Sequence, residues 1–525
     1  LKNKKKLGTK NLIINNIGCK IKYLMLDTNC LLHPCVANIL EKYKKGELRI
    51  DDKQSLRTQI ESYIWNLIER YIEDMVSRVK PEYLYIAIDG VAPIGKILQQ
   101  RQRRYRYLYD KSIKLNNNSE TEVNIKANGI CEPIIPISSI ELTPGTDYME
   151  RIHENMLKFV LRLNNSGTKA IYSSYHEEGE GEHKILQYIK KNTNTDDSVI
   201  IYGLDADLLF LALGAGEIKN IYIMREVQVF NNKELDLDEF PEYNYVEIKE
   251  LQRLINNLEI STTDFVVLSY MIGNDFLPGM LTLDVKKGGL DKIFEAFQKV
   301  LIKSKISLRN EYNIITNKLV IQTENNNYEL NHELLKEMFK ELVWTEKYTW
   351  KNINRDRFLS QRDVPLNELE ARKLRAEEDR KDSILKFVSG LSDCNDCLTK
   401  VEFNSSEEFY SYYLGINSLD LDSTIISKMV QDYITGLTWC LNYYLNECGS
   451  WSWGYNFMVA PTITDIIKYY PNTIHYNQSK RELNPVEQLI LAIPPETYKY
   501  VIESDIIKKL QNNKKIGYMF PISYD

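Results

Sequence analysis

The stretch Ser198–Leu213 reads SVIIYGLDADLLFLAL, and it opens with a short apolar run that ends in aspartate. Runs of this length that are rich in Ile, Val and Tyr are typical of buried strands. Asp205 and Asp207 stand two residues apart where the expected strand ends, so both carboxylates can point to one side. The stretch therefore predicts a buried strand that delivers two acids to one edge of a sheet.

Two other stretches share this design: Tyr23–Asp27 (YLMLD) and Tyr83–Asp89 (YLYIAID) are also short apolar runs that end in aspartate. Helical patterns lie between them, such as Gln59–Val79, whose apolar residues recur near helical spacing. Alternating strands and helices indicate an α/β fold with a largely parallel sheet flanked by helices. Because ligands of such sheets bind outside the carboxyl ends of the strands, the aspartates are expected to meet at the ligand-binding edge.

A second acidic feature is Glu177–Lys184 (EEGEGEHK), which crowds four carboxylates around two glycines. An isolated acidic run of this kind can be a solvated turn, but hard cations also take carboxylate oxygens, and glycine lets the backbone come close. Glu180 and Glu182 have the two-residue spacing of Asp205 and Asp207, and Asp275 follows the apolar run of FVVLSYMIGNDFLPG.

These observations give one set of candidate catalytic and metal-binding acids: Asp27, Asp89, Glu180, Glu182, Asp205, Asp207 and Asp275. So many carboxylates in one cleft would repel one another and raise several pKa values unless divalent cations bind among them. No zinc-type set of His and Cys accompanies the acids, which favours Mg²⁺, with Mn²⁺ as the alternative. Two such ions about 4 Å apart are the usual machinery for in-line phosphodiester cleavage.

The chain of 525 residues is long enough for two or more domains, and we place the boundary near residue 300. No apolar run approaches the roughly 20 residues of a membrane span, and the basic N-terminus lacks the apolar region of a signal peptide. Eight cysteines in a chain this long indicate reduced thiols rather than a disulfide scaffold. We therefore expect a cytoplasmic protein, in the host or viral-factory cytoplasm if it is viral, with the nucleus as the alternative. A net charge of −6 does not exclude nucleic-acid binding, for which a local basic stripe suffices.

The part after residue 300 is expected to be mainly helical, with amphipathic segments at Asn331–Val343 and Ile425–Leu445. The mixed-charge stretch Asn367–Asp382 predicts a solvated linker helix. Cys394 and Cys397 form a single CxxC pair without a second pair or suitable histidines nearby, so we do not expect a zinc site there.

Four residues soon after Asp89 fall on one face of an expected helix at i, i+4, i+7 and i+8: Lys96, Gln100, Arg103 and Arg104. Spacing alone fits either a solvated basic face or a phosphate pocket. The place of these residues just beyond a candidate catalytic aspartate favours the pocket, in which arginine offers planar, bidentate hydrogen bonds.

Six stretches, in this order, resemble the XRN family of 5′→3′ exoribonucleases: LMLDTNCLLHPC, YIAIDGVAPIGKILQQRQRRYR, ELTPGTDYM, GEGEHK, IYGLDADLLFLAL and VVLSYMIGNDFLP. The later WSWGYNFMVAPTITD and RELNPVEQLILAIPPE are similar to the second conserved region of that family. The resemblance implies a PIN/FEN-like nuclease domain over residues 1–300 and a mainly helical second region over 301–525. It also implies a processive, magnesium-dependent enzyme that removes nucleoside monophosphates from single-stranded RNA with a 5′ monophosphate, in RNA decay or processing.

The resemblance assigns roles to individual residues. The seven acids match the family's metal ligands, and Lys96, Gln100, Arg103 and Arg104 match the residues that hold the 5′ phosphate. His33 and Trp453 match the partners that stack on the terminal base from either side, with Trp451 as the weaker candidate. The chain lacks the family's usual Met-Gly-Val/Ile-Pro start and stops at FPISYD, so we expect a fragment.

Two alternatives belong to other classes. A flap-endonuclease-like DNA 5′ nuclease would share the acidic sheet edge, but it should carry a helix-hairpin-helix clamp after Asp275, where FLPGMLTLDVKKGGLDKI shows no clear clamp spacing. An RNA-binding scaffold without catalysis would have lost one or more acids, and all seven are present. No membrane partner is expected.

Overall fold

The computed structural model describes residues 12–51, 53–117, 137–215, 218, 220–227, 240–283, 288–307, 318–323, 327–346, 405–414, 421–474, 476–481, 483–494, 497–498 and 504–513. They form two compact units. The first takes its described residues from Leu1–Tyr105, Leu115–Leu258 and Lys480–Asp525, and the second from Arg106–Lys114 and Glu259–Ser479.

These units do not divide near residue 300, because α10 (Gly289–Ser307) packs against α11 (His332–Leu342) within the second unit. The domain assignment 1–300 and 301–525 stays a prediction about conserved regions. The linker helix expected near 367–382 and the pair Cys394 and Cys397 lie outside the described residues.

A seven-stranded sheet forms the centre of the first unit, with the order β1-β7-β6-β5-β2-β3-β4. Its strands are β1 (Ile13–Ile14), β2 (Tyr23–Asp27), β3 (Tyr83–Ala87), β4 (Lys169–Ser173), β5 (Ser198–Tyr202), β6 (Asn220–Glu226) and β7 (Tyr243–Glu247). Strands β2 to β6 run parallel, and β7 and β1 are antiparallel additions at one side. The three predicted aspartate-ending runs are β2, β3 and β5, which are neighbours in the sheet.

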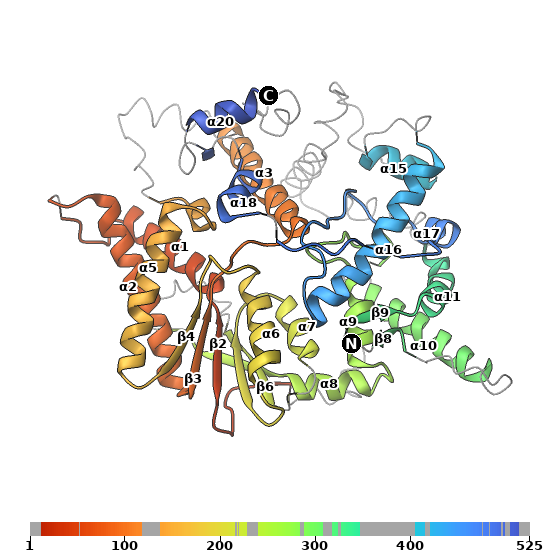
Figure 1. Cartoon of the computed structure of the whole chain (residues 1–525), viewed down its shortest axis with the longest axis horizontal. Coiled ribbons are helices and arrows are strands. Elements are labelled where there is room, and N and C mark those ends of the chain that lie inside the picture. Colours follow the sequence, from red (N-terminus) through yellow and green to blue (C-terminus); the bar gives the residue numbers. More distant parts are fainter. Residues whose placement is uncertain are drawn as a thin grey trace, which may run out of the picture. The chain divides into compact units, whose positions relative to one another are not determined.

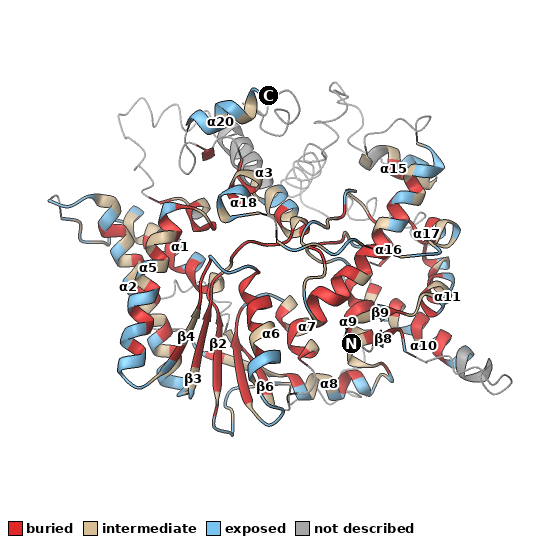
Figure 2. Cartoon of the chain, viewed as in Figure 1, coloured by how far each residue is buried: buried red, intermediate tan, exposed pale blue. Residues whose placement is uncertain are grey.

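Helices cover both faces of this sheet (Figure 1). One face packs into a single apolar core with α1 (Asn29–Lys44), α2 (Leu56–Val79) and α5 (Asp147–Asn165). The other face is covered by α6 (Gly181–Asn192), α7 (Asp207–Gly214) and α8 (Ile248–Asn256). Figure 2 shows the central strands as buried, and every residue of β2 and β5 is buried, as expected for parallel strands covered on both faces. The α/β fold class is confirmed.

The C-terminal helices α18 (Pro485–Ala492) and α20 (Ser504–Gln511) belong to the first unit. Gln488 Oε1 accepts a hydrogen bond from the Ala92 amide at 2.7 Å, just before α3 (Ile94–Asn117). Gly145, at a φ of +93°, lies so close that an added Cβ would stand 2.7 Å from the carbonyl oxygen of Pro485. The last described residues therefore complete a unit that begins almost 500 residues earlier.

The second unit is mainly helical, as expected. Its helices are α9 (Thr262–Tyr270), α10, α11, α15 (Ser406–Leu414), α16 (Ser423–Leu445) and α17 (Ile463–Tyr469), beside a hairpin of β8 (Val320–Gln322) and β9 (Tyr328–Leu330). Helix α16 is buried along most of its length and packs against α9, α17 and β9. Among the described helices, none is long and apolar enough to cross a membrane.

Candidate active site

Six of the seven predicted acids lie at the carboxyl edge of the sheet in the first unit. Asp27 is the last residue of β2, and its partner in the register is Ala87, so Asp89 follows on the neighbouring strand. Glu180 is the N-cap of α6, and Glu182 lies in the first turn of that helix. Asp205 follows β5, and Asp207 is the first residue of α7.

Gly181 brings four of these acids together. Its amide donates a hydrogen bond to Asp89 Oδ1 at 2.7 Å, which fixes the start of α6 against the end of β3. A Cβ added at Gly181 would lie 2.7 Å from Asp27 Oδ1 and 3.3 Å from Asp89 Oδ1. Only glycine leaves room for both carboxylates at this position, so Gly181 of EEGEGEHK serves the close packing of acids.

Burial and mutual repulsion disturb the titration of this cluster. Burial, and then the charge of Asp89, raise the pKa of Asp27 to about 8. Burial and the neighbouring Glu180 raise the pKa of Asp89, and the same two causes raise the pKa of Glu182 well above its ordinary value. In the absence of a cation, these buried carboxylates repel one another and therefore hold their protons to higher pH than isolated carboxylates do.

The fold leaves carboxylate oxygens at this edge that a hard cation could take. Asp27 Oδ1 and Glu182 Oε2 are buried and have no hydrogen-bond partner among the described residues. Asp27, Cys30 and Asp205 each offer one ligand atom, and these atoms lie within 4.8 Å of one another. Buried carboxylate oxygens without partners are the donors that Mg²⁺ takes, so the cluster fits the predicted ion.

Cys30 is a member of this group that sequence reasoning missed. Its thiol donates to Asp27 Oδ2 at 3.2 Å and accepts from the Leu204 amide at 3.5 Å. Burial and the charge of Asp27 raise the pKa of Cys30, so the sulfur stays protonated and orients the carboxylate. Cys30 stands within LMLDTNCLLHPC, three residues after Asp27, and this position was the available signal.

The predicted phosphate-binding residues lie on α3, beside the acids. Lys96 Nζ forms a 2.6 Å ion pair with Glu180 Oε1. Gln100 Oε1 and Arg104 Nη1 are buried and lack a hydrogen-bond partner among the described residues. Burial, and then the charge of the exposed Arg103, lower the pKa of Arg104 to about 10. A buried cation that faces a second cation and keeps an unused donor is suited to an anion.

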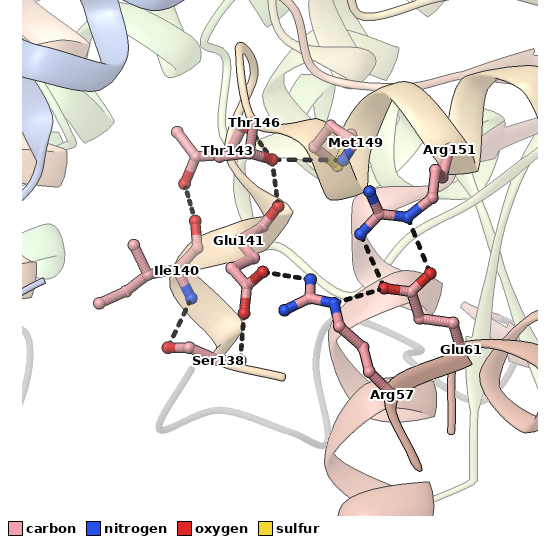
Figure 3. Close-up of polar contacts among 9 residues, drawn as sticks. All are labelled: Arg57, Glu61, Ser138, Ile140, Glu141, Thr143, Thr146, Met149 and Arg151. Atoms are coloured by element: carbon pink, nitrogen blue, oxygen red, sulfur yellow. Dashed lines mark hydrogen bonds and ion pairs between the residues drawn. The ribbon is translucent and has the colours of Figure 1, made fainter. Parts of the chain in front are cut away.

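Arg104 is positioned by Thr143, and Figure 3 shows the hydrogen bonds that hold Thr143 and the turn around it. Arg104 Nη2 donates to Thr143 Oγ1 at 2.8 Å, and that hydroxyl donates to the Ile140 carbonyl at 2.7 Å. The short 3-10 helix at Ser139–Leu142 is capped by Glu141, which accepts from the Ser138 amide at 2.8 Å. Thr143 belongs to the motif ELTPGTDYM, but its contact with α3 could not be predicted from spacing.

Two arginines anchor this capped turn to the helical layer. Arg57 of α2 donates to Glu141 Oε2 at 2.5 Å and to Glu61 Oε1 at 2.9 Å. Arg151 of α5 donates two hydrogen bonds to the Glu61 carboxylate, at 2.8 Å and 2.7 Å. Paired, partly buried charges of this kind hold a turn in one geometry. The turn therefore presents Thr143 to Arg104 from a fixed position.

The two predicted base-stacking residues belong to different units, so each is described by itself. His33 lies on α1, where desolvation by the surrounding protein, and then the charges of Arg103 and Arg104, lower its pKa. In the second unit, Trp453 stacks on the buried Trp439, with ring centroids 4.7 Å apart and an interplanar angle of 25°. The predicted sandwich stays a prediction.

Asp275, the seventh acid, lies in the second unit on a tight loop after α9. Asn274 Oδ1 accepts from the Phe276 and Leu277 amides at 2.9 Å and 2.8 Å, which turns the chain around Asp275. Gly279 closes the loop, because an added Cβ there would lie 1.9 Å from the Ile272 carbonyl oxygen. The loop holds Asp275 in place, and its role as a ligand stays a prediction.

Comparisons with known proteins match nearly the whole chain. The family profile described as "XRN 5'-3' exonuclease N-terminus" matches residues 2–227, and the profile "Xrn1 helical domain" matches residues 256–504. The 5'-3' exoribonuclease 1 of Saccharomyces cerevisiae is 26% identical over 91% of this chain and 38% of its own length. That of Homo sapiens is 26% identical over 90% of this chain and 29% of its own length.

A third relative, the 5'-3' exoribonuclease 2 homolog of Drosophila melanogaster, is 25% identical over 93% of this chain and 60% of its own length. The chain thus spans less than two thirds of the length of each of these relatives. The first profile covers the parallel strands with their acidic edge, and the second covers most of the helical unit. The chain therefore belongs to the XRN family of 5′-3′ exonucleases.

Proposed function

We propose that this chain is a metal-dependent 5′→3′ exoribonuclease that degrades single-stranded RNA with a 5′ monophosphate to nucleoside monophosphates, processively. The observation that carries the proposal is that two groups of buried polar atoms lack a hydrogen-bond partner among the described residues. The first group is the carboxylate oxygens Asp27 Oδ1 and Glu182 Oε2. The second is Gln100 Oε1 and Arg104 Nη1 on α3, the helix whose Lys96 pairs with Glu180 of the acidic edge. A cation would satisfy the carboxylate oxygens, and a terminal phosphate would accept a hydrogen bond from Arg104 Nη1.

Magnesium would be held by the acids at the sheet edge, where it would polarise the scissile phosphate and lower the pKa of an attacking water. The side chains of α3 would bind the 5′ phosphate by charge-assisted hydrogen bonds. Lys96 lies on the same helix as Arg104 and pairs with Glu180, so it would hold the phosphate end at a fixed distance from the acids. Such positioning makes the first phosphodiester the one that reacts, which is what an exonuclease needs.

The proposed function is tested by incubating the purified chain with matched 5′-phosphorylated RNA and DNA, with Mg²⁺ and with EDTA. We expect nucleoside monophosphates from RNA with Mg²⁺ only. Preferred cleavage of branched DNA would favour a flap-endonuclease-like activity, and tight RNA binding without any product would favour a non-catalytic scaffold.

The stability of the metal-free chain is expected to fall as the pH rises. Asp27 keeps its proton up to a pKa of about 8 in the folded chain, but it loses that proton near its ordinary pKa of about 3.9 when unfolded. The folded chain thus binds more protons between these values, so the free energy of unfolding decreases with pH across that window. In EDTA, we expect a lower Tm at pH 8 than at pH 6, measured by thermal denaturation.

Mg²⁺ should restore the loss at pH 8, by about 2.7 kcal/mol for each ion supplied at about 100 times its Kd. Asp27→Asn, which is similar in shape but uncharged, is the matched control and should flatten both the pH and the Mg²⁺ response. Equal Tm values at pH 6 and pH 8 in EDTA would contradict the expectation.

Loss of the predicted base stack should weaken RNA binding by a smaller amount, and this amount should not depend on the RNA sequence. His33→Ala or Trp453→Ala should weaken binding of short single-stranded RNA by about 1–3 kcal/mol, similarly for all four homopolymers, because every base has a π face. Fluorescence anisotropy measures this loss. Trp344→Ala, at a tryptophan that is 50% exposed, is the control and should bind like wild type. A loss confined to one base would instead indicate hydrogen-bonded readout.

A further inference from the structure

Two histidines and a glutamate outside the acidic edge form a separate cluster on the first unit. Glu150 and His153 stand one turn apart on α5, and His176 lies in the loop between β4 and α6. Each of the three offers one ligand atom, and these atoms lie within 4.8 Å of one another. We propose that this cluster is a second metal site, which binds a divalent transition cation of the Zn²⁺ type.

The distances suit such an ion. His176 Nε2 lies 3.2 Å from Glu150 Oε2. Two ligands at about 2.0–2.2 Å from a tetrahedral Zn²⁺ stand roughly 3.3 Å from each other, so this pair already has the spacing of one tetrahedral edge. His153 completes the set, with its ring centroid 4.9 Å from that of His176 and the two rings at 82°. Exposure of His176 leaves the fourth position to water.

Hydrogen bonds from neighbouring tyrosines orient the ligand side chains, as such bonds do around bound metals. His153 Nδ1 lies 3.2 Å from the Tyr172 hydroxyl, so Nδ1–H can donate there and leave the lone pair of Nε2 for a cation. The Tyr175 hydroxyl donates to Glu150 Oε2 and orients the carboxylate. Metal-binding histidines and carboxylates are regularly oriented by outer hydrogen bonds of this kind.

The donor set also separates this cluster from the acidic edge. Imidazole nitrogens suit Zn²⁺, Co²⁺, Ni²⁺ and Cu²⁺, whereas sets made only of carboxylates suit Mg²⁺. An ion here would fasten the loop after β4 to α5. Because His176 precedes Glu180 by only four residues, the ion would also limit the motion of the segment that leads into α6. The proposal does not rest on the proposed nuclease function.

The test uses the full chain in excess Mg²⁺, which occupies the carboxylate set, and titrates it with Co²⁺ as a visible probe of imidazole ligands. We expect one Co²⁺ per chain with ligand-field absorption, displaced by Zn²⁺, and a higher Tm in its presence. His153→Ala, His176→Ala and Glu150→Gln should each weaken Co²⁺ binding at least about 100-fold, since even outer-shell changes cost 10- to 100-fold.

His332→Ala is the matched control, because His332 Nδ1 also contacts a tyrosine hydroxyl, that of Tyr470 at 2.9 Å, but belongs to no such cluster among the described residues. It should bind Co²⁺ like wild type. Glu150→Gln keeps the side-chain shape, and thermal denaturation without metal verifies that each variant folds. Equal Co²⁺ affinity in wild type and all three ligand variants, or no Co²⁺ bound in excess Mg²⁺, would show that the cluster is only a hydrogen-bonded link between the loop and α5.

Discussion

Asp205→Asn is expected to lower nucleotide release from 5′-phosphorylated RNA by at least about 100-fold while leaving RNA binding near wild type. Changing a group that merely supports metal ligands costs roughly 10- to 100-fold, so loss of a ligand charge should reach or exceed the upper value. Asp205 shares its surroundings with Asp27 and Cys30 and is exposed, so the amide can be tolerated without unfolding. Single-turnover assays with excess enzyme separate the chemical step from binding.

Asp197→Asn is the matched control for this variant. Asp197 precedes the start of β5, at the opposite end of the strand that leads to Asp205, and pairs with Lys22 at 2.8 Å. Asp197→Asn removes one negative charge next to β5, as Asp205→Asn does, but at the end away from the acidic edge. The rate of nucleotide release should therefore be unchanged. A rate for Asp205→Asn within a few-fold of wild type would exclude the proposed role of the sheet edge.

The second large effect concerns the 5′ end of the substrate. Wild type should prefer a 5′ monophosphate over a 5′ hydroxyl, since a charge-assisted hydrogen bond contributes about 1.5–3 kcal/mol. This corresponds to roughly 10- to 150-fold for each bond. Arg104→Ala should lose most of the preference, because Arg104 Nη1 is the buried donor without a partner among the described residues. A 5′ triphosphate should be rejected by wild type as too large.

Two further variants test whether the preference for a 5′ monophosphate depends on Arg104 and its surroundings. Thr143→Val removes the hydroxyl that fixes Arg104, so it should weaken the preference less than loss of the guanidinium does. Arg101→Ala removes an equal charge from the same helix, but Arg101 donates to the Leu491 carbonyl and lies over the Tyr105 ring, so the preference should remain. Equal rates on all three ends in wild type would mean that this face of α3 is only a solvated basic surface.

The sequence predicted the sheet edge well because the signal there is local. A short, largely buried run that ends in aspartate or is followed by one within three residues specifies both a strand and the place of its acid, and β2, β3 and β5 each carry that pattern. The start of α6 depends on a contact that is not local, because the amide of its first residue, Gly181, donates to Asp89. The resemblance to the XRN family is likewise confirmed by the matched profiles.

What could not be predicted rests on contacts between distant residues. Nothing near Gln488 signals that its side chain accepts from the Ala92 amide, 396 positions earlier. The same holds for the hydrogen bond between Arg104 and Thr143. It also holds for the contact of His176, which follows β4, with Glu150 of α5. Side-chain polarity is visible in a sequence, but which buried polar atoms find partners is decided only by packing.

The return of the C-terminal helices to the first unit has a consequence for synthesis on the ribosome. The described contacts of Gln488 and Leu491 with the segment around α3 cannot form until the intervening Glu259–Ser479 has been made. At about 5–20 residues per second, those 221 residues delay completion by roughly 10–45 s. The nascent first unit must therefore wait with part of its surface uncovered, so its yield in cells should depend on chaperones and on the speed of translation through the second unit.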